Sequence, residues 1–282
     1  MIPALLAYAR PSTVEEAIDL LGDPDAKLLA GGHSLIPMMK LRLSRPSLLV
    51  DIGRLQMRGL TAENGQIEVG ALTTYDMLAS GSPAQVPDAL REAAAAVGDV
   101  QVRNRGTIGG GTAHADPASD CAASLIALGA RLRVRSANGP RECAAEDFFV
   151  SPFTTALAPA EIIESLAFPR PARGQGSAYY ATSDAASGYP LAGAAVNVEH
   201  DGDRPVTIRV GLTGAAPAPC RLPAVEQALT GSPSFDAVRE AVADVRLNHR
   251  DANERYRRQL IAVAMIRAFE AAVARAGGGS PS

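Results

Sequence analysis

The residues best suited to chemistry lie between Asp99 and Asp120, in the segment DVQVRNRGTIGGGTAHADPASD. It holds the consecutive glycines Gly109 to Gly111, and a histidine and two aspartates follow them. Its apolar residues follow neither a helical nor a strand period, so we expect a long irregular loop. Such a loop exposes backbone N–H groups, and the helix expected at 117–128 favours a bound anion such as phosphate. The alternative is an ordinary glycine-rich surface loop.

A second glycine turn lies near the start of the chain. The run AKLLA at 26–30 is typical of a short strand, Gly31-Gly32-His33-Ser34 follows it, and a helix is expected over 35–43. The turn matches neither the dinucleotide fingerprint GxGxxG nor the phosphate loop GxxxxGK followed by Ser or Thr. Two glycine turns in one domain still predict a long ligand with several polar groups.

Both turns resemble those of a known family. AGGHSLIPMMKLRL (30–43) and QVRNRGTIGGGTAHADPASD (101–120) resemble the two FAD loops of the flavin-binding medium subunits of molybdenum hydroxylases, which include carbon monoxide dehydrogenase and xanthine dehydrogenase. The resemblance continues in order along nearly the whole chain, through LLVDIGRL (48–55), DFFVSPFTTALAPAEII (147–163), DAASGYPLAGAA (184–195) and ERYRRQLIAVAMIRAF (254–269).

The resemblance implies an FAD site with named residues. The two loops would hold the pyrophosphate and ribityl chain through backbone N–H groups and hydroxyls. Asp116 and Asp120 would accept hydrogen bonds from sugar or ribityl hydroxyls. Ile108 would contact the flavin ring. Tyr189 matches a family tyrosine that lies over the flavin near its reactive nitrogen, so it is the expected catalytic residue. The expected cofactor-binding residues are Ala30, Gly31, Gly32, His33, Ser34, Leu35, Thr107, Ile108, Gly109, Gly110, Gly111, His114, Asp116 and Asp120.

Each of these residues also has a structural explanation. Asp116 and Asp120 could cap the following helix, Ile108 could fill the core, and Tyr189 could be buried in the last domain. Gly111 departs from many relatives, which have Ser or Asn there, so one side-chain hydrogen bond to the flavin is expected to be missing.

The histidines and cysteines predict no metal site. His33 and His114 are far apart, and an iron–sulfur cluster needs about four clustered cysteines. The cysteines Cys121, Cys143 and Cys220 are scattered and odd in number, which favours a reducing cytoplasm.

The resemblance also implies partners. In the family, a large molybdopterin-binding subunit oxidises the substrate, a small subunit with two [2Fe–2S] clusters relays electrons, and the FAD subunit passes them to an external acceptor, within a dimer of heterotrimers. We expect the last role for this chain. Two alternatives stay open: a free-standing FAD-dependent oxidoreductase with its own substrate pocket, for which His114 is the candidate base, and a nucleotide-binding module without redox chemistry. Carbon monoxide, an N-heterocycle and an aldehyde all remain open as the large subunit's substrate.

Composition excludes several other classes. The net charge of −3 and the pI near 5.9 argue against a nucleic-acid groove. The sequence has no run of about 18 apolar residues and no secretory signal at its start, so we expect no membrane span and a cytoplasmic location.

The expected fold class is α+β. We expect a PCMH-type FAD-binding domain over 1–170, with subdomains of about 1–55 and 56–170, then a boundary at PRPARGQG (169–176). A C-terminal domain of the carbon monoxide dehydrogenase flavoprotein type, with a three-stranded antiparallel sheet and helices, is expected over 177–282. Expected strands are 48–52, 66–70, 131–135, 162–168, 177–182, 191–199 and 206–212, and further expected helices are 14–21, 73–80, 87–97, 223–229, 235–245 and 254–276.

Local signals refine these expectations. Ser12 and Glu15 have the spacing of a capping box, and Thr73 is the expected cap of the helix at 73–80. Asn138-Gly139 and Asp201-Gly202 are expected to form hairpin turns.

Overall fold

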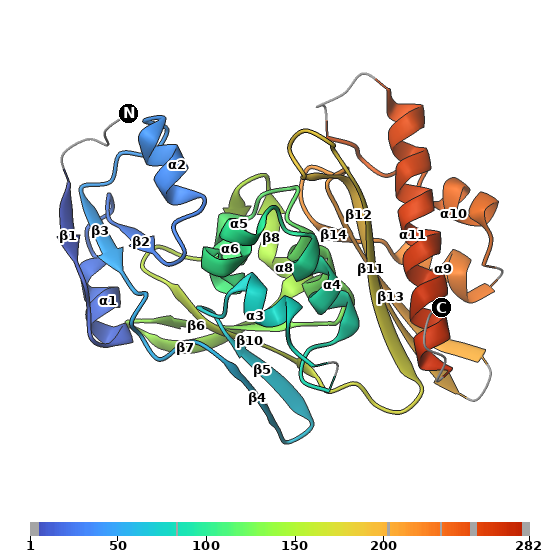
Figure 1. The fold of residues 1–282 in the computed structure, drawn as a ribbon, viewed down its shortest axis with the longest axis horizontal. Helices are drawn as coiled ribbons and strands as arrows, with labels where there is room; N and C mark the ends of the chain where they lie inside the picture. Colours follow the sequence, from blue (N-terminus) through green and yellow to red (C-terminus); the bar gives the residue numbers. More distant parts are fainter. Residues whose placement is uncertain (1–5, 83, 202–203, 232, 249–252, 278–282) are drawn as a thin grey trace.

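A computed structural model describes residues 6–82, 84–201, 204–231, 233–248 and 253–277. It shows a mixed α/β fold in which three sheet-based units follow one another from the N-terminus to the C-terminus (Figure 1). The first two units meet at the glycine turns, and the second and third share an extensive packed seam.

The first unit is a small parallel sheet with the strand order β1-β3-β2. Parallel strands need crossover connections, and α1 and α2 lie in them. Buried side chains such as Ile18, Val50 and Ile52 form its core. The elements are β1 (Ala7–Ala9), α1 (Val14–Leu20), β2 (Lys27–Leu29), α2 (Leu35–Lys40) and β3 (Leu48–Asp51).

The second unit is an antiparallel sheet with the order β4-β5-β10-β6-β7, and helices pack on one of its faces (Figure 1). On β6, Leu132 and Val134 point into the core, whereas the alternate arginines point outward. The elements are β4 (Leu60–Glu63), β5 (Gln66–Gly70), α3 (Tyr75–Ala79), α4 (Asp88–Ala96), α5 (Val100–Arg105), α6 (Ile108–His114), α7 (Asp120–Ala127), β6 (Arg131–Ser136), β7 (Gly139–Ala144), α8 (Ala145–Phe148), β8 (Phe149–Ser151), β9 (Thr154–Thr155) and β10 (Ile162–Pro169).

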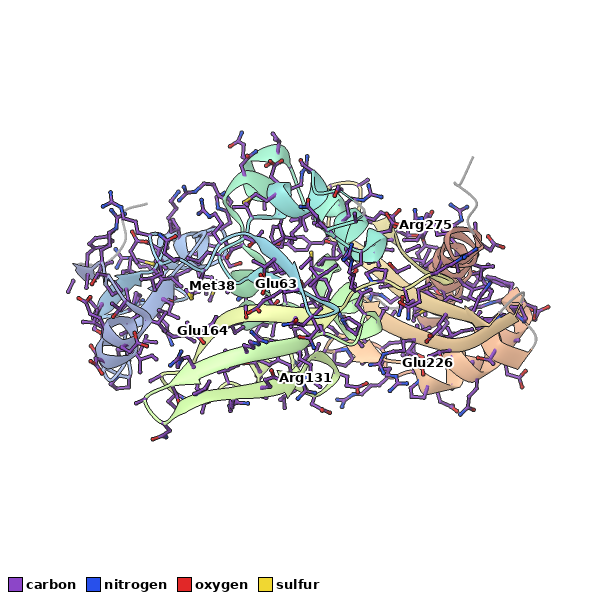
Figure 2. The ribbon with its side chains drawn as sticks, turned by 90° about the horizontal axis from the view of Figure 1, so that it is seen from below. Met38, Glu63, Arg131, Glu164, Glu226 and Arg275 are labelled. Atoms are coloured by element: carbon purple, nitrogen blue, oxygen red, sulfur yellow. The ribbon has the colours of Figure 1, made fainter. Side chains whose placement is uncertain are left out.

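The outer face of this sheet carries cross-strand ion pairs, and Figure 2 shows Arg131 and Glu164 on it. Arg133 lies 2.7 Å from Glu68, and Arg135 lies 3.3 Å from Glu164. The Arg135–Glu164 pair joins the neighbouring strands β6 and β10, and a pair of this kind stabilises the register by about 0.2–1 kcal/mol, whereas the Arg133–Glu68 pair reaches across β10 to β5.

The third unit is an antiparallel sheet with the order β11-β12-β13-β14. The long helix α11 covers one face of it, and α4 and α7 of the second unit pack on the other (Figure 1). The helices approach the sheet so closely that glycine is needed on both faces. A Cβ at Gly176 would lie 2.1 Å from the Ala272 carbonyl oxygen of α11, and a Cβ at Gly211 would lie 2.1 Å from the Ala123 carbonyl oxygen of α7. The elements are β11 (Gln175–Ser183), β12 (Pro190–Asp201), β13 (Arg204–Thr213), β14 (Cys220–Arg221), α9 (Pro223–Gly231), α10 (Phe235–Ala241) and α11 (Glu254–Ala276).

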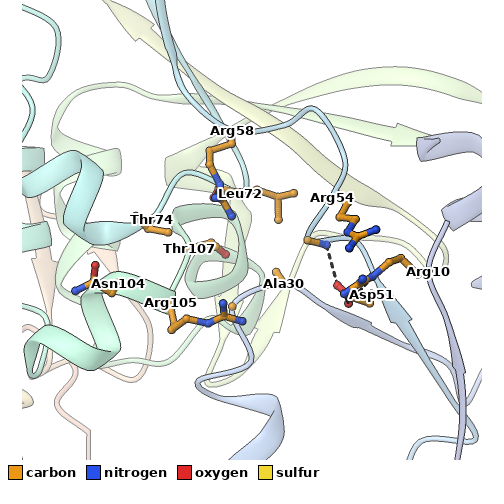
Figure 3. A pocket seen from close by; sticks show the side chains of 12 residues that line it. Arg10, Ala30, Asp51, Arg54, Arg58, Leu72, Thr74, Asn104, Arg105 and Thr107 are labelled. Atoms are coloured by element: carbon orange, nitrogen blue, oxygen red, sulfur yellow. Dashed lines mark hydrogen bonds and ion pairs between the residues drawn. The ribbon is translucent and has the colours of Figure 1, made fainter. Parts of the chain in front are cut away.

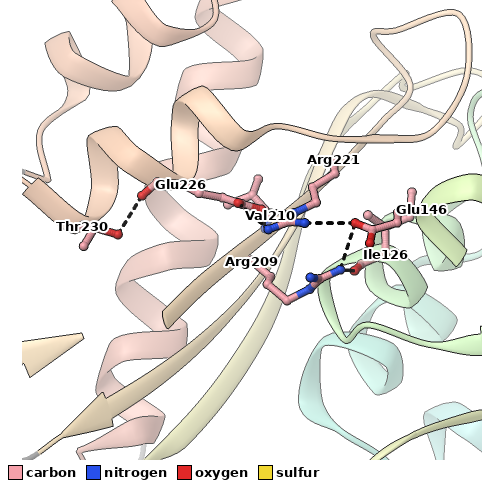
Figure 4. A network of polar contacts seen from close by, with 7 residues as sticks. All are labelled: Ile126, Glu146, Arg209, Val210, Arg221, Glu226 and Thr230. Carbon is pink, nitrogen blue, oxygen red and sulfur yellow. Dashed lines mark hydrogen bonds and ion pairs between the residues drawn. The ribbon is translucent and has the colours of Figure 1, made fainter. Parts of the chain in front are cut away.

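A charged network helps to join the second and third units (Figure 4). Glu146 of α8 accepts hydrogen bonds from Arg209 of β13 and Arg221 of β14, each at 3.1 Å. Arg221 also binds Glu226 of α9, whose carboxylate accepts the Val210 backbone N–H at 3.0 Å. The short strand β14 is therefore fixed to both units by side chains.

Two expectations about the larger elements are wrong. The C-terminal sheet has a fourth strand, β14, paired with β13 at Gly211↔Arg221 and Leu212↔Cys220; a two-residue strand has no detectable period. The segment 99–120 is largely the helices α5 and α6, because Asp99 and Thr107 cap them through bonds to the N–H groups of Val102 and Gly110.

The expected caps are each displaced by one residue. Thr13, not Ser12, accepts the Glu16 N–H at the start of α1, and the Glu16 carboxylate binds Ser12 in return. Thr74, not Thr73, caps α3. The expected hairpin joins β6 and β7, but its turn is Ala137-Asn138, and Gly139 is already the first residue of β7. The turn expected at Asp201-Gly202 lies partly outside the described residues.

Candidate functional site

The first glycine turn presents a row of open backbone donors. Within the described chain, the N–H groups of residues 31–35 donate no hydrogen bond, although the carbonyls of Gly32 and Ser34 accept the first bonds of α2. Gly32 has φ +77°, a left-handed conformation that glycine adopts without strain. His33 is exposed, and its Nδ1 lies 3.0 Å from the Gly31 carbonyl oxygen. Successive open N–H groups at the start of a helix form an anion site.

The second glycine turn is organised differently from our expectation. The N–H groups of residues 108–111 donate within the chain, to the carbonyls of Thr73, Ala71 and Thr107 and to the Thr107 hydroxyl. All four N–H groups therefore have partners within the chain, two in the segment 71–73 and two in α6 and its Thr107 cap, and they do not form the row of open donors that we expected. The Thr107 N–H is the one donor of 107–111 that has no partner in the described structure.

The glycines of α6 allow close packing instead. A Cβ at Gly109 would lie 2.5 Å from that of Ala71, and one at Gly111 would lie 1.9 Å from the Tyr75 hydroxyl oxygen. Gly110 is exposed, and its Cβ position lies 3.8 Å from the Ala30 Cβ. The space that a side chain at position 111 would need is therefore filled by Tyr75.

The two glycine turns are in direct contact. A Cβ at Gly31 would lie 2.0 Å from the Arg105 carbonyl oxygen and 3.0 Å from the Gly106 Cα, so only glycine fits there. An isolated antiparallel β-bridge between Thr74 and Thr107 connects the second turn to the segment that precedes α3. Two segments that are distant in the sequence thus form one continuous surface.

Two residues with left-handed backbone conformations meet where α6 ends at His114. Ala115 has φ +49° and Phe153, in the β8–β9 hairpin, has φ +56°; the Phe153 N–H donates to the Ala115 carbonyl at 3.0 Å. The rings of His114 and Phe153 have centroids 5.2 Å apart. Strained backbone of this kind tends to occur at functional sites. Asp116, one residue on, accepts the Ala118 N–H at 2.9 Å, but α7 begins only at Asp120, so this bond closes a local turn and does not cap the helix.

Asp120 joins the second unit to the third. It is 6% exposed, and its Oδ1 accepts the hydroxyl of Tyr179 on β11 at 2.7 Å. Burial raises the pKa of Asp120 to about 6, with a smaller contribution from the charge of Asp116 and an opposing one from the Tyr179 hydroxyl. One carboxylate oxygen is therefore committed to the seam.

Tyr189 is exposed rather than buried, at 55% of its surface, which removes the structural alternative for it. Its loop is held by Asp184, whose carboxylate accepts the N–H groups of Ala186 and Ser187. Burial raises the pKa of Tyr75 well above its usual value, and the nearby Cys121, Asp120 and Tyr189 raise it further.

A cavity of about 200 Å³ adjoins the first turn (Figure 3). Its walls come from the first and second units. The lining residues are Arg10, Ala30, Gly31, Asp51, Gly53, Arg54, Arg58, Leu72, Thr74, Asn104, Arg105 and Thr107.

The sequence reasoning missed several residues at this site. Tyr75, Tyr179 and Phe153 come from distant segments, and only Phe153 lay within a segment quoted for the family resemblance. Among the described residues, no group of three or more His, Cys, Asp or Glu side chains could hold a metal ion. None of the helices in the described part of the chain has the length and apolar character that a membrane crossing needs.

Comparison with known proteins gives the same assignment. Residues 4–171 match the family model described as the FAD binding domain in molybdopterin dehydrogenase, and residues 177–272 match the carbon monoxide dehydrogenase flavoprotein C-terminal domain.

Individual relatives agree with these matches. The carbon monoxide dehydrogenase medium chain of Hydrogenophaga pseudoflava is 40% identical over 253 residues, covering 88% of each chain. The glyceraldehyde dehydrogenase medium chain of Sulfolobus acidocaldarius is 35% identical, over 96% of this chain and 99% of the other. The structure of the Hydrogenophaga pseudoflava carbon monoxide dehydrogenase that lacks the Mo-pyranopterin moiety matches with a TM-score of 0.91 and 38% identity, over 98% of this chain and 99% of that one. The chain therefore belongs to the FAD-binding subunits of the molybdopterin dehydrogenases, and its cofactor is FAD.

Proposed function

We propose that this chain is the electron-transfer subunit of a heterotrimeric molybdenum hydroxylase. It would accept electrons from the [2Fe–2S] clusters of a small partner subunit and pass them to an external acceptor. A large molybdopterin-binding subunit would oxidise the substrate, and the enzyme would be a cytoplasmic dimer of heterotrimers. Relatives of similar identity are named for carbon monoxide and for glyceraldehyde, so this subunit does not indicate the substrate.

The open N–H groups of residues 31–35 carry this proposal. A pyrophosphate has several anionic oxygens, and these donors have no competing partner in the described chain. The adjoining Thr107 N–H and the exposed Gly110 extend the same surface, since the two turns are in contact. The residues present therefore fit the diphosphate portion of FAD.

Bound FAD would supply a ring system that takes electrons singly and releases them in pairs. We assign the remaining expected residues to roles around it. The second oxygen of Asp120 and the carboxylate of Asp116 would accept hydrogen bonds from ligand hydroxyls. Ile108 and His114 would line the site, and the exposed ring of Tyr189 would cover the flavin.

We also propose a functional division of the chain. Residues 1–170, with subdomains of about 1–55 and 56–170, would bind the cofactor, and 177–282 would contribute Tyr189 and the seam. The Asp120–Tyr179 hydrogen bond supports this division of labour, because it fixes the third unit against the expected flavin site.

The test compares two matched glycines. Gly32 and Gly65 have φ values of +77° and +74°, so alanine strains the backbone equally at both, but Gly65 has open space around it. We expect Gly65→Ala to keep the flavin absorption bands of the wild type and Gly32→Ala to lose them. The wild type should also co-purify with the small partner subunit, whose iron–sulfur clusters would be seen in the visible absorption spectrum.

Other outcomes would redirect the proposal. Flavin bands with no iron–sulfur subunit, in gentle purification from the native source, would favour the free-standing oxidoreductase; an unchanged turnover of His114→Ala would then remove its candidate base. A wild-type protein that takes up no added FAD would contradict the site itself.

A further inference from the structure

Tyr75, at the start of α3, carries a hydroxyl that no residue of the described chain binds. The residue is only 8% exposed, yet no hydrogen bond joins its hydroxyl to another described residue. We propose that the Tyr75 hydroxyl donates a hydrogen bond to the flavin ring of bound FAD. This inference rests on the flavin site proposed above and adds to it a residue that lies outside both glycine turns.

Two glycines of the second turn make room for the Tyr75 side chain. A Cβ at Gly106 would lie 2.8 Å from the ring carbon Cε2, and a Cβ at Gly111 would lie 1.9 Å from the hydroxyl oxygen. The Tyr75 backbone is attached to the same turn, because its N–H donates to the Gly106 carbonyl oxygen at 3.1 Å. The ring therefore lies along the turn from Gly106 to Gly111, and backbone contacts fix the position of its hydroxyl.

The Tyr75 hydroxyl is enclosed on most sides but keeps some open surface. Among the described residues, the almost fully enclosed side-chain nitrogen and oxygen atoms that lack a partner belong to Arg91, His200 and Arg209, so the Tyr75 hydroxyl oxygen is still accessible. Burying a hydroxyl costs free energy unless it gains a hydrogen bond, and phenylalanine would fill the same space without that cost. Tyrosine at this position therefore indicates a hydrogen-bond partner that reaches the hydroxyl from outside the chain.

The surroundings of the hydroxyl make it a donor. Burial and the nearby Cys121, Asp120 and Tyr189 raise the pKa of Tyr75 well above its usual value, so the hydroxyl keeps its proton. Tyr189 is the residue that we expect to cover the flavin, and its influence on Tyr75 favours the flavin ring, rather than the diphosphate, as the acceptor. The carbonyl oxygens and ring nitrogens of a flavin can accept such a hydrogen bond.

A donor at the flavin ring would affect both binding and redox properties. Reduced flavin carries more negative charge than oxidised flavin, so the Tyr75 hydroxyl would bind the reduced form more strongly. Removal of the hydroxyl should therefore weaken FAD binding and make the reduction potential of the bound flavin more negative. A hydroxyl that served only the packing of α3 on α6 would change neither property.

Two matched tyrosine variants, Tyr75→Phe and Tyr180→Phe, test the proposal. Tyr180 lies on the face of β11 that α11 covers, where its hydroxyl is hydrogen-bonded to Arg267, so it is the control for losing a hydroxyl away from the flavin. We expect Tyr75→Phe to raise the dissociation constant of FAD about three- to tenfold in a fluorescence titration, because one hydrogen bond is lost. It should also shift the visible absorption bands and lower the reduction potential of the bound flavin. Tyr180→Phe should leave all three unchanged.

Three results would overturn the proposal. Equal FAD affinity of Tyr75→Phe and the wild type would show that the hydroxyl does not bind the cofactor. Weaker binding with an unchanged spectrum and potential would move the contact from the flavin ring to another part of FAD. Urea unfolding of the flavin-free Tyr75→Phe protein at a lower concentration than the flavin-free wild type would assign the hydroxyl to the fold.

Failure of the underlying flavin site is recognised separately. It would appear as a wild-type protein that takes up no FAD, or as a Gly32→Ala protein that binds FAD as the wild type does. Normal FAD uptake by the wild type together with unchanged binding by Tyr75→Phe would leave the site in place and remove only Tyr75 from it.

Discussion

Replacing Gly111 with alanine should destabilise the protein only while Tyr75 keeps its hydroxyl. The new Cβ would lie 1.9 Å from the Tyr75 hydroxyl oxygen, far inside van der Waals contact, and Tyr75 is 8% exposed, so its ring has little room to move. Overpacking of this kind costs about 1–3 kcal/mol.

Tyr75→Phe should remove most of that cost. It deletes the atom at 1.9 Å and leaves the ring carbon Cζ, 3.3 Å from the new Cβ, as the nearest neighbour. Alanine inside α6 then gains up to about 1 kcal/mol of helix propensity over glycine. That gain is the same in both backgrounds and cancels in the double-mutant cycle, so the two substitutions should be coupled by the overpacking cost alone, about 1–3 kcal/mol.

The assay is urea unfolding of the wild type, both single variants and the double variant, followed by far-ultraviolet circular dichroism. Tyr75→Phe alone is the control for the lost hydroxyl. If Gly111→Ala costs the same in both backgrounds, within about 0.5 kcal/mol, the packing of α6 on Tyr75 is not what requires glycine at this position.

Three further predictions concern other parts of the site. Burial raises the pKa of Asp120 to about 6, above the unfolded value near 3.9, so the folded chain holds this proton more tightly. Relative to Asp120→Asn, the flavin-free wild type should lose up to about 3 kcal/mol of unfolding free energy as the pH rises from 4 to 7; a difference that does not vary with pH contradicts the shift. Gly31→Ala would place a Cβ 2.0 Å from the Arg105 carbonyl oxygen and separate the two turns. FAD affinity measured by fluorescence titration should therefore fall at least about tenfold, whereas the control Gly65→Ala should bind FAD as the wild type does. Tyr189→Ala should keep the flavin but change the rate at which the purified complex reduces its acceptor, and an unaltered rate would remove Tyr189 from the reaction.

Strong local signals allowed parts of the fold to be predicted from sequence. The strand at 66–70 and the helix at 254–276 have the expected bounds, because one alternates between flanking turns and the other keeps a helical period until Gly277. The signals for their bounds are contained within the segment itself. The caps of α1 and α3 were displaced by one residue because adjacent Ser and Thr side chains are equally able to cap.

The second glycine segment could not be predicted in this way. Glycine disfavours helices, so three in succession indicate a loop. The structure forms α6 there because Thr107 caps it and because Ala71 and Tyr75 fill the space beside the glycines. The packing contribution comes from residues more than 30 positions earlier in the chain, which no local pattern reveals. The arginines of the cavity were similarly hidden, since they come from separate segments.

The seam between the second and third units connects these observations. Tyr189 belongs to the third unit, whereas the glycine turns belong to the first and second, so the flavin site that we propose is complete only if the units are fixed to one another. Several polar contacts do this: Tyr179 binds Asp120, Arg275 binds Glu92, and the Ser177 hydroxyl accepts the Ala89 N–H at 3.2 Å. The packed helices α4 and α7 fill the space between the two sheets. Because Asp120 takes part in both the seam and the expected flavin site, a change in its charge should alter the placement of the third unit and the environment of the cofactor together.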